Sequence, residues 1–296
     1  MLNHKKANLF FLGMMLFAII SSTIIGQMGL SIQLSLLANQ YSFFIPIIIF
    51  FFITRQNPIE TMRFKNPGIL NMVLVVPLMI ACMALVVFIG SISNILFKNY
   101  LMETFNLFGD MGLGQWLLLV AVTPAFCEEC IMRGVILGNY RDLSIHKAAV
   151  FNGLMFGMLH MNFNQFFYAA ILGVVMSYLV YYTNSIFTSM FLHFLINGFS
   201  ATMNWLAQVF KVFENEQYAV DTEALIQSLP TQAVFAVLGL VFIVLLLRLF
   251  KKINENEQVE FKEEEASIAV EAKSYLMDIP LILSMIVFIV ANAVIR

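Results

Sequence analysis

Long runs of apolar residues, interrupted by short groups of charged residues, dominate the chain. No charged residue occurs in 7–54, and no Asp, Glu, Lys or Arg occurs in 148–210. A transmembrane helix needs about 20 residues, so the first run predicts two crossings, roughly 8–27 and 31–54, and the second predicts three. Four further segments predict one crossing each, namely residues 66–97, 111–137, 224–247 and 279–295. The pattern therefore predicts about nine transmembrane helices, with a range of eight to ten.

This pattern also predicts the fold class. Lipid admits only helices and closed barrels as spanning structures, and no segment shows the alternation of apolar and polar residues that is typical of a barrel strand. We therefore expect an all-α, polytopic membrane helix bundle that forms a single membrane domain over residues 1–296. The largest charged stretch, residues 251–275, is expected to be a solvated loop between the last two spans.

Composition supports this class and excludes others. Hydrophobic residues make up 60% of the chain and charged residues 11%, whereas soluble domains carry about 25% charged residues. A soluble globular enzyme and a disordered protein are both excluded. The net charge of −2 provides no basic field, so nucleic acid is not expected as a partner. The expected environment is the lipid bilayer of a cell membrane.

The distribution of Lys and Arg predicts the orientation in the membrane. With the N-terminus in the cytoplasm, cytoplasmic segments hold twelve of the sixteen Lys and Arg residues, and external segments hold three. The positive-inside rule therefore favours a cytoplasmic N-terminus and a cytoplasmic loop at 251–275. A composition rich in Phe, Ile, Met and Asn suits a bacterium of low genomic GC, which suggests the bacterial plasma membrane.

Three charged residues lie within the fourth predicted span: Glu128, Glu129 and Arg133. Each charge in mid-membrane costs roughly 2.5–3.5 kcal/mol, so such residues pair with one another or line a wet cavity, and they are candidates for function. Glu129 and Arg133 are four residues apart on one helical face and can form a structural ion pair. Glu128 points about 100° away from Glu129. An unpaired carboxylate in this setting suits a general base or acid.

Later spans add two histidines and an amide. His160 ends the segment from Phe151, and His193 and Asn197 are four residues apart on one helical face. Counting at about 1.5 Å per residue from the predicted inner helix ends places Glu128 and these three residues at a similar depth, in the inner half of the membrane. This shared depth predicts that they form one site.

The three motifs resemble those of a known family. Glu-Glu-x-x-x-Arg at 128–133, Phe-x-x-x-His at 156–160 and His-x-x-x-Asn at 193–197 occur in this order on successive spans. Together they look like the motifs of the CPBP family, the CAAX prenyl-protease and bacteriocin-processing intramembrane proteases, also called the Abi family. The resemblance covers the expected catalytic core, residues 112–205, about a third of the chain.

The resemblance implies a role for each matching residue. Glu128 would activate the attacking water, and His160 would hold that water or help to polarise it. His193 and Asn197 would bind the developing oxyanion. Two residues would support the geometry of the site: Glu129 and Arg133. A carboxylate with two imidazoles and an amide supplies the base and the donors that peptide hydrolysis needs. The expected substrate is a membrane-associated, prenylated or precursor peptide, or a membrane-protein precursor.

The cofactor requirement is left open by the sequence. The family has long been described as metalloproteases, and Glu128, His160 and His193 are candidate ligands for a zinc ion with one open position. The chain has no His-Glu-x-x-His helix, and a metal-independent glutamate mechanism uses the same residues directly on water. We favour the metal-independent mechanism.

Two other classes of protein remain as alternatives. A transporter or channel also uses intramembrane Glu and His residues as an ion or proton relay, although no internal repeat is visible in the chain. A bacteriocin-immunity or scaffold protein on the same fold is the third class. Cys127 and Cys130 flank the glutamates as Cys-x-x-Cys, and we expect them to be apolar packing residues rather than a redox or metal site.

Overall fold

The computed structural model describes residues 3–99, 104–105, 107–108, 111–210, 222–255 and 277–294, and these ranges contain helices and no strand. The α-helices are α1 (Asn3–Gln27), α2 (Ile32–Ser42), α3 (Phe44–Thr54), α4 (Pro58–Thr61), α5 (Ile69–Leu96), α7 (Leu113–Trp116), α8 (Thr123–Glu129), α9 (Ile145–Leu159), α10 (Phe163–Thr183), α11 (Ile186–Val209), α12 (Thr222–Ile253) and α14 (Ile279–Val294). Two π-helices, η1 (Leu117–Val122) and η2 (Cys130–Ile136), alternate with α7 and α8, and these four elements form one continuous helix. The all-helical, multi-pass fold expected from the sequence is confirmed.

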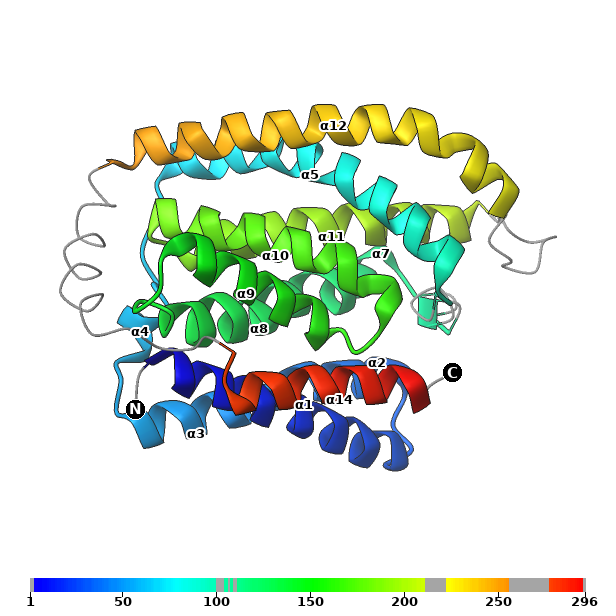
Figure 1. The fold of residues 1–296 in the computed structure, drawn as a ribbon. Coiled ribbons are helices and arrows are strands. Elements are labelled where there is room, and N and C mark those ends of the chain that lie inside the picture. Colours follow the sequence, from blue (N-terminus) through cyan, green and yellow to red (C-terminus); the bar gives the residue numbers. More distant parts are fainter. Residues whose placement is uncertain are drawn as a thin grey trace.

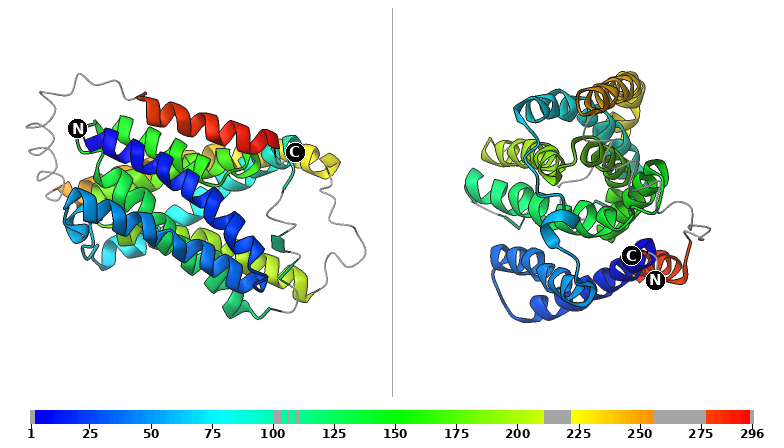
Figure 2. Two further views of the ribbon diagram at one scale, coloured as in Figure 1. Left: turned by 90° about the horizontal axis from the view of Figure 1, so that it is seen from below. Right: turned by 90° about the vertical axis from the view of Figure 1, so that its left-hand side faces the viewer.

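The helices lie side by side in three layers (Figures 1 and 2). α5 and α12 pack along each other in one outer layer, and α1, α2, α3 and α14 form the opposite outer layer. The middle layer contains α9, α10, α11 and the helix built from α7, η1, α8 and η2. α11 contacts both π-helices and α8. The segments that carry the three sequence motifs therefore lie together in the middle of the bundle.

Six helical segments are long and apolar enough to cross a membrane, with α2 and α3 counted as one. The remaining three predicted spans are also helical but are shorter or interrupted. They are the helix from α7 to η2, the 15-residue α9 and the 16-residue α14. Many outward-facing side chains are large and apolar, including Ile48, Phe52 and Ile53. An apolar surface on helices of this length is typical of a lipid-facing surface, so the chain is a multi-pass membrane protein.

The structure corrects two boundaries expected from the sequence. The span predicted at 31–54 is divided into α2 and α3 at Phe43. Pro46 lies in the first turn of α3, where the missing N–H of proline is tolerated. The charged loop expected at 251–275 begins later, because α12 continues to Ile253. Residues 256–275 of that loop lie outside the described part of the chain.

Glycines bring α9 and α10 into close contact. A Cβ atom added to Gly153 would lie 2.5 Å from the carbonyl oxygen of Ala170, and one added to Gly157 would lie 2.6 Å from that of Phe166. Gly173 of α10 in turn approaches Gly153. This is the use of Gly-x-x-x-Gly that permits two membrane helices to approach closely, and it sets the position of Phe156 and His160 on α9.

We expect Gly153→Val to destabilise the protein by about 1–3 kcal/mol, because the added atoms overlap the backbone of α10 and force the helices apart. The measurement is the unfolding transition in mixed micelles. Gly90→Ala is the matched control, since a Cβ there meets nothing within 4 Å, and its stability should equal that of the wild type or exceed it. Equal stability of Gly153→Val and wild type would contradict the close approach.

A buried polar cluster joins the start of α1 to the segment between η2 and α9 and to the start of α14. The side chain of His4 pairs with Asp142 at 2.6 Å, and both side chains are almost fully buried. Tyr140 donates to Asn8 at 2.5 Å, and Asn8 donates to Asp278 at 3.0 Å. Burial, followed by the nearby Asp278 and Asp142 carboxylates, raises the pKa of Tyr140 well above its usual range, so its hydroxyl remains a donor. These contacts hold α1, the loop before α9 and the start of α14 together.

Candidate active site

The helix that carries the glutamates is widened on both sides of them. The π-helices η1 and η2 flank α8, which ends at Glu129. π-helical turns in α-helices are frequent at functional sites. Pro124 has no N–H to donate to the carbonyl four residues earlier, which is that of Val120. This carbonyl instead accepts a hydrogen bond from the side-chain amide of Asn197 at 3.0 Å. The proline therefore leaves the helix with an acceptor that anchors a residue of α11.

Glu129 and Arg133 form the ion pair that their spacing predicts. The Nη1 atom of Arg133 donates to Oε1 of Glu129 at 2.7 Å, and both side chains have 0% exposure. The guanidinium carbon lies 4.4 Å from the centre of the Phe156 ring, which is a cation–π contact. The pair thus connects the helix that carries the glutamates to α9.

His193 lies between two fixed partners. Its Nδ1 atom is 3.1 Å from Oε1 of Glu129, and its Nε2 atom is 3.1 Å from the side-chain nitrogen of Asn197. A carboxylate can only accept, so Nδ1 carries the proton, and Nε2 accepts the hydrogen bond from Asn197. The network therefore sets the neutral Nδ1–H tautomer of His193 and the orientation of its ring.

Glu128 is the accessible carboxylate of the site. Its side chain is 13% exposed, whereas the side chain of Glu129 is fully buried. The Oε2 atom lies 4.0 Å from Nε2 of His193, which is too long for a hydrogen bond. The Oε1 atom accepts a hydrogen bond from the side-chain amide of Gln40 at 3.2 Å. Glu128 is therefore held from one side and faces the His193 ring on the other.

His160 lies at the end of its helix. α9 ends at Leu159, and His160 is its C-cap. Its Nδ1 atom is 2.9 Å from the carbonyl oxygen of Phe156, which leaves Nε2 as the acceptor nitrogen. No ion pair or hydrogen bond joins His160 to Glu128 or His193 in the described structure. The Phe156 ring connects the histidines, since its centre lies 5.0 Å from His160 and 5.7 Å from His193.

The residues suggested as zinc ligands do not fit a metal ion in this arrangement. The described part of the chain contains no group of three or more His, Cys, Asp or Glu residues placed to hold one. Both ring nitrogens of His193 already have partners, Glu129 and Asn197. A ligand nitrogen needs its lone pair for the metal, so Glu128, His160 and His193 would have to rearrange to form a zinc site.

The two cysteines beside the glutamates are enclosed by protein. Cys127 has 0% exposure and Cys130 has 1%. Cys82 is buried as well, and all three thiols are unpaired. These positions agree with small apolar packing residues.

Three contributors to this geometry lack a sequence motif. Gln40 reaches Glu128 from α2, which is 88 residues away in the chain. The Val120 carbonyl is recognisable only through the proline four residues later. Asn152 donates to the carbonyl of Met132 within η2 at 2.7 Å and accepts from Ser177 of α10 at 2.9 Å. A buried amide on a predicted span is the signal that could have identified Asn152.

The fold and this site together define a multi-pass membrane protein with acids, an imidazole and an amide gathered inside the bundle. Ionisable residues inside a membrane bundle mark functional sites, and the comparison with known families indicates the class of function. Residues 110–199 match the model of the family described as type II CAAX prenyl endopeptidase Rce1-like. The match covers about a third of the chain and agrees with the three motifs that resemble those of the CPBP family of intramembrane proteases. The searches of curated proteins and of solved structures find no match to the chain.

Proposed function

We propose that this protein is an endopeptidase that hydrolyses a peptide bond of a membrane-associated, prenylated or precursor peptide, with Glu128 as the general base. The observation that carries this proposal is the position of the accessible Glu128 carboxylate. It faces Nε2 of His193 at 4.0 Å, while Glu129 and Asn197 fix the His193 ring from both sides. The family match supports proteolysis in the membrane in general.

Water is the nucleophile in this proposal. The 4.0 Å between Oε2 of Glu128 and Nε2 of His193 is about 1 Å longer than a hydrogen bond. A water molecule beside these two atoms can therefore contact both. Glu128 takes one proton from this water while the water oxygen attacks the peptide carbonyl carbon. Glu128 then gives the proton to the leaving nitrogen as the C–N bond breaks. The hydrogen bond from Gln40 orients the carboxylate for both transfers.

Asn197 and His193 are the proposed donors to the oxyanion. Asn197 keeps one N–H on the Val120 carbonyl and directs the other at Nε2 of His193. A substrate oxygen that enters beside this nitrogen can accept that second N–H. His193 adds a donor when Nε2 is protonated, and Glu129 stabilises the resulting charge. We assign to His160 the task of holding the water from the end of α9.

The chemistry proposed is independent of a metal, because the ring nitrogens of His193 are bound to protein partners. The test is cleavage of a quenched-fluorescent peptide library by purified protein in proteoliposomes, with and without a strong chelator. We expect the cleavage rate to be the same with and without the chelator. Cleavage that stops with chelator and returns with zinc would assign a metalloprotease. No cleavage, together with ion flux through the same liposomes, would assign a transporter or channel and overturn the proposal.

Pro124 provides a prediction that separates activity from stability. In Pro124→Ala the new N–H can donate to the Val120 carbonyl and compete with Asn197 for this acceptor, which weakens the anchor of Asn197. We expect kcat/KM to fall about 10²-fold, within the range for loss of one oxyanion donor, while thermal stability is equal or higher, because Ala favours a helix interior. The measurement pairs kinetics with thermal unfolding of the same preparation.

The result for Pro124→Ala is interpreted against Pro77→Ala. Pro77 also lies inside a membrane helix, α5, which carries none of the proposed site residues, and activity of that variant should remain at the wild-type level. Wild-type activity in Pro124→Ala would show that the Val120 carbonyl does not anchor a catalytic group.

A further inference from the structure

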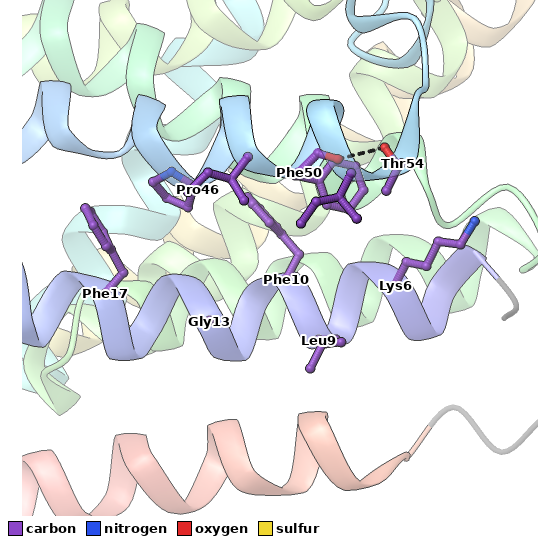
Figure 3. A pocket seen from close by; sticks show the side chains of 10 residues that line it. Lys6, Leu9, Phe10, Gly13, Phe17, Pro46, Phe50 and Thr54 are labelled. Carbon is purple, nitrogen blue, oxygen red and sulfur yellow. Dashed lines mark hydrogen bonds between the residues drawn. The ribbon is translucent and has the colours of Figure 1, made fainter.

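A groove on the outer face of the bundle lies between α1 and α3 (Figure 3). Its volume is about 550 Å³, within the roughly 300–1,000 Å³ of small-molecule sites. Phe10 and Phe50 form its floor with their rings 5.1 Å apart. Its walls are apolar side chains, of which Leu9 and Ile49 are about half exposed. This groove is separate from Glu128 and is not used by the proposed proteolysis.

The groove has the length of one lipid leaflet. It extends along α1 from Lys6 to Phe17, and eleven residues at about 1.5 Å each correspond to roughly 16 Å. The hydrocarbon core of a bilayer is about 30 Å thick, so one leaflet contributes about 15 Å. Gly13 lies along this path, and a Cβ there would meet nothing within 4 Å. A single acyl chain therefore fits the groove in length and in chemistry.

The two ends of the groove differ in charge. Figure 3 shows Lys6 and Thr54 at one end and Phe17 and Pro46 at the other. Lys5 precedes Lys6 in the chain and Arg55 follows Thr54, so three cations belong to the same end. None of the ten residues that line the groove is acidic. The hydroxyl of Thr54 donates to the carbonyl of Phe50 at 2.8 Å, which leaves Lys6 as the group that can select a headgroup.

We propose that this groove binds one acyl chain of an anionic phospholipid from the surrounding leaflet, with its phosphate held by Lys6. The apolar walls of the groove provide the affinity for the acyl chain, and the cationic end selects an anionic over a zwitterionic headgroup. A single Lys or Arg near a membrane surface attracts anionic lipid with a free energy that corresponds to about a fivefold preference. The bound lipid would cover the exposed side chains between α1 and α3.

The test uses two photoreactive phospholipids that carry the same diazirine acyl chain, one phosphatidylglycerol and one phosphatidylcholine. Each is added to the full-length protein in neutral lipid nanodiscs, and labelled peptides are identified by mass spectrometry. We expect phosphatidylglycerol to label α1 and α3 about fivefold more than phosphatidylcholine. Lys6→Gln should lower this preference, although Lys5 and Arg55 remain at that end of the groove, and Lys6→Arg should keep it.

Gly13→Leu should suppress labelling of α1 and α3 by both lipids, because a Cβ at this position meets no protein atom within 4 Å and the longer side chain occupies the groove. Two matched controls should leave labelling unchanged. Gly26→Leu places the same side chain elsewhere on α1, and Lys252→Gln removes a cation from α12 in the opposite layer. Since labelling requires no proteolysis, the result is independent of the proposed activity.

Three outcomes would overturn the proposal. Equal labelling by the two lipids would show that the headgroup is not selected. Undiminished labelling in Gly13→Leu would show that the chain binds outside the groove. Displacement of phosphatidylglycerol by a prenylated peptide at equal concentration would assign the groove to the substrate's lipid.

Discussion

Glu128→Gln is expected to retain the fold and to lose about 10²–10⁴-fold in kcat/KM, the usual contribution of a general base. Glutamine has the shape of glutamate and can still accept the hydrogen bond from Gln40. It cannot take a proton from water or deliver one to the leaving nitrogen. Because Glu128 is partly exposed and lies 4.0 Å from the nearest histidine nitrogen, its charge contributes little to stability.

The measurement is kcat/KM for the best peptide of the library, with wild type and variant reconstituted at equal density. Glu60→Gln is the matched control, since Glu60 is exposed on α4, and it should cleave at the wild-type rate. Activity of Glu128→Gln above about a tenth of the wild-type value would exclude Glu128 as the base, since even a weak general base contributes about 10²-fold.

Arg133→Met is expected to have the largest effect on stability. The variant leaves the Glu129 carboxylate buried without its cation, at a position where both side chains have 0% exposure. Removal of one partner from a buried ion pair costs about 3–5 kcal/mol. The contact of the guanidinium with the Phe156 ring is lost as well. Unfolding in mixed micelles measures this change.

The double variant Glu129→Leu/Arg133→Met separates the structural and catalytic roles of the pair. Replacing both charges with apolar groups is often neutral for stability, so most of the loss in Arg133→Met should be recovered. Activity should stay low, because Nδ1 of His193 no longer has the acceptor that sets its tautomer. Full activity in the double variant would show that the pair does not position His193. A loss of less than about 1 kcal/mol in Arg133→Met would contradict its burial.

The sequence was sufficient to predict the parts of this structure that depend on local pattern. Charge-free runs located the apolar helices, because lipid requires about 20 apolar residues for each crossing. The i,i+4 spacing of Glu129 and Arg133 predicted their ion pair, which is confirmed at 2.7 Å. The same spacing on α11 placed His193 beside Asn197. Each of these relations is set by the geometry of one helix.

Relations between helices could not be predicted in this way. Gln40 contacts Glu128 only because α2 packs against α8. The end of α9 at Leu159, which makes His160 a cap residue, depends on a short connection to α10 that apolar composition does not reveal. The π-helices around Glu128 are also invisible in a pattern of apolar residues, although Pro124 marks a carbonyl that is free to bind another helix.

Identification of the product termini by mass spectrometry tests the central claim most directly. The peptide library is incubated with wild-type protein and with Glu128→Gln in matched proteoliposomes that contain chelator. The account predicts new termini from a subset of peptides with the wild type and none above background with Glu128→Gln. Equal termini from both proteins, or none from the wild type, would contradict the assignment of this chain as a glutamate-dependent intramembrane protease.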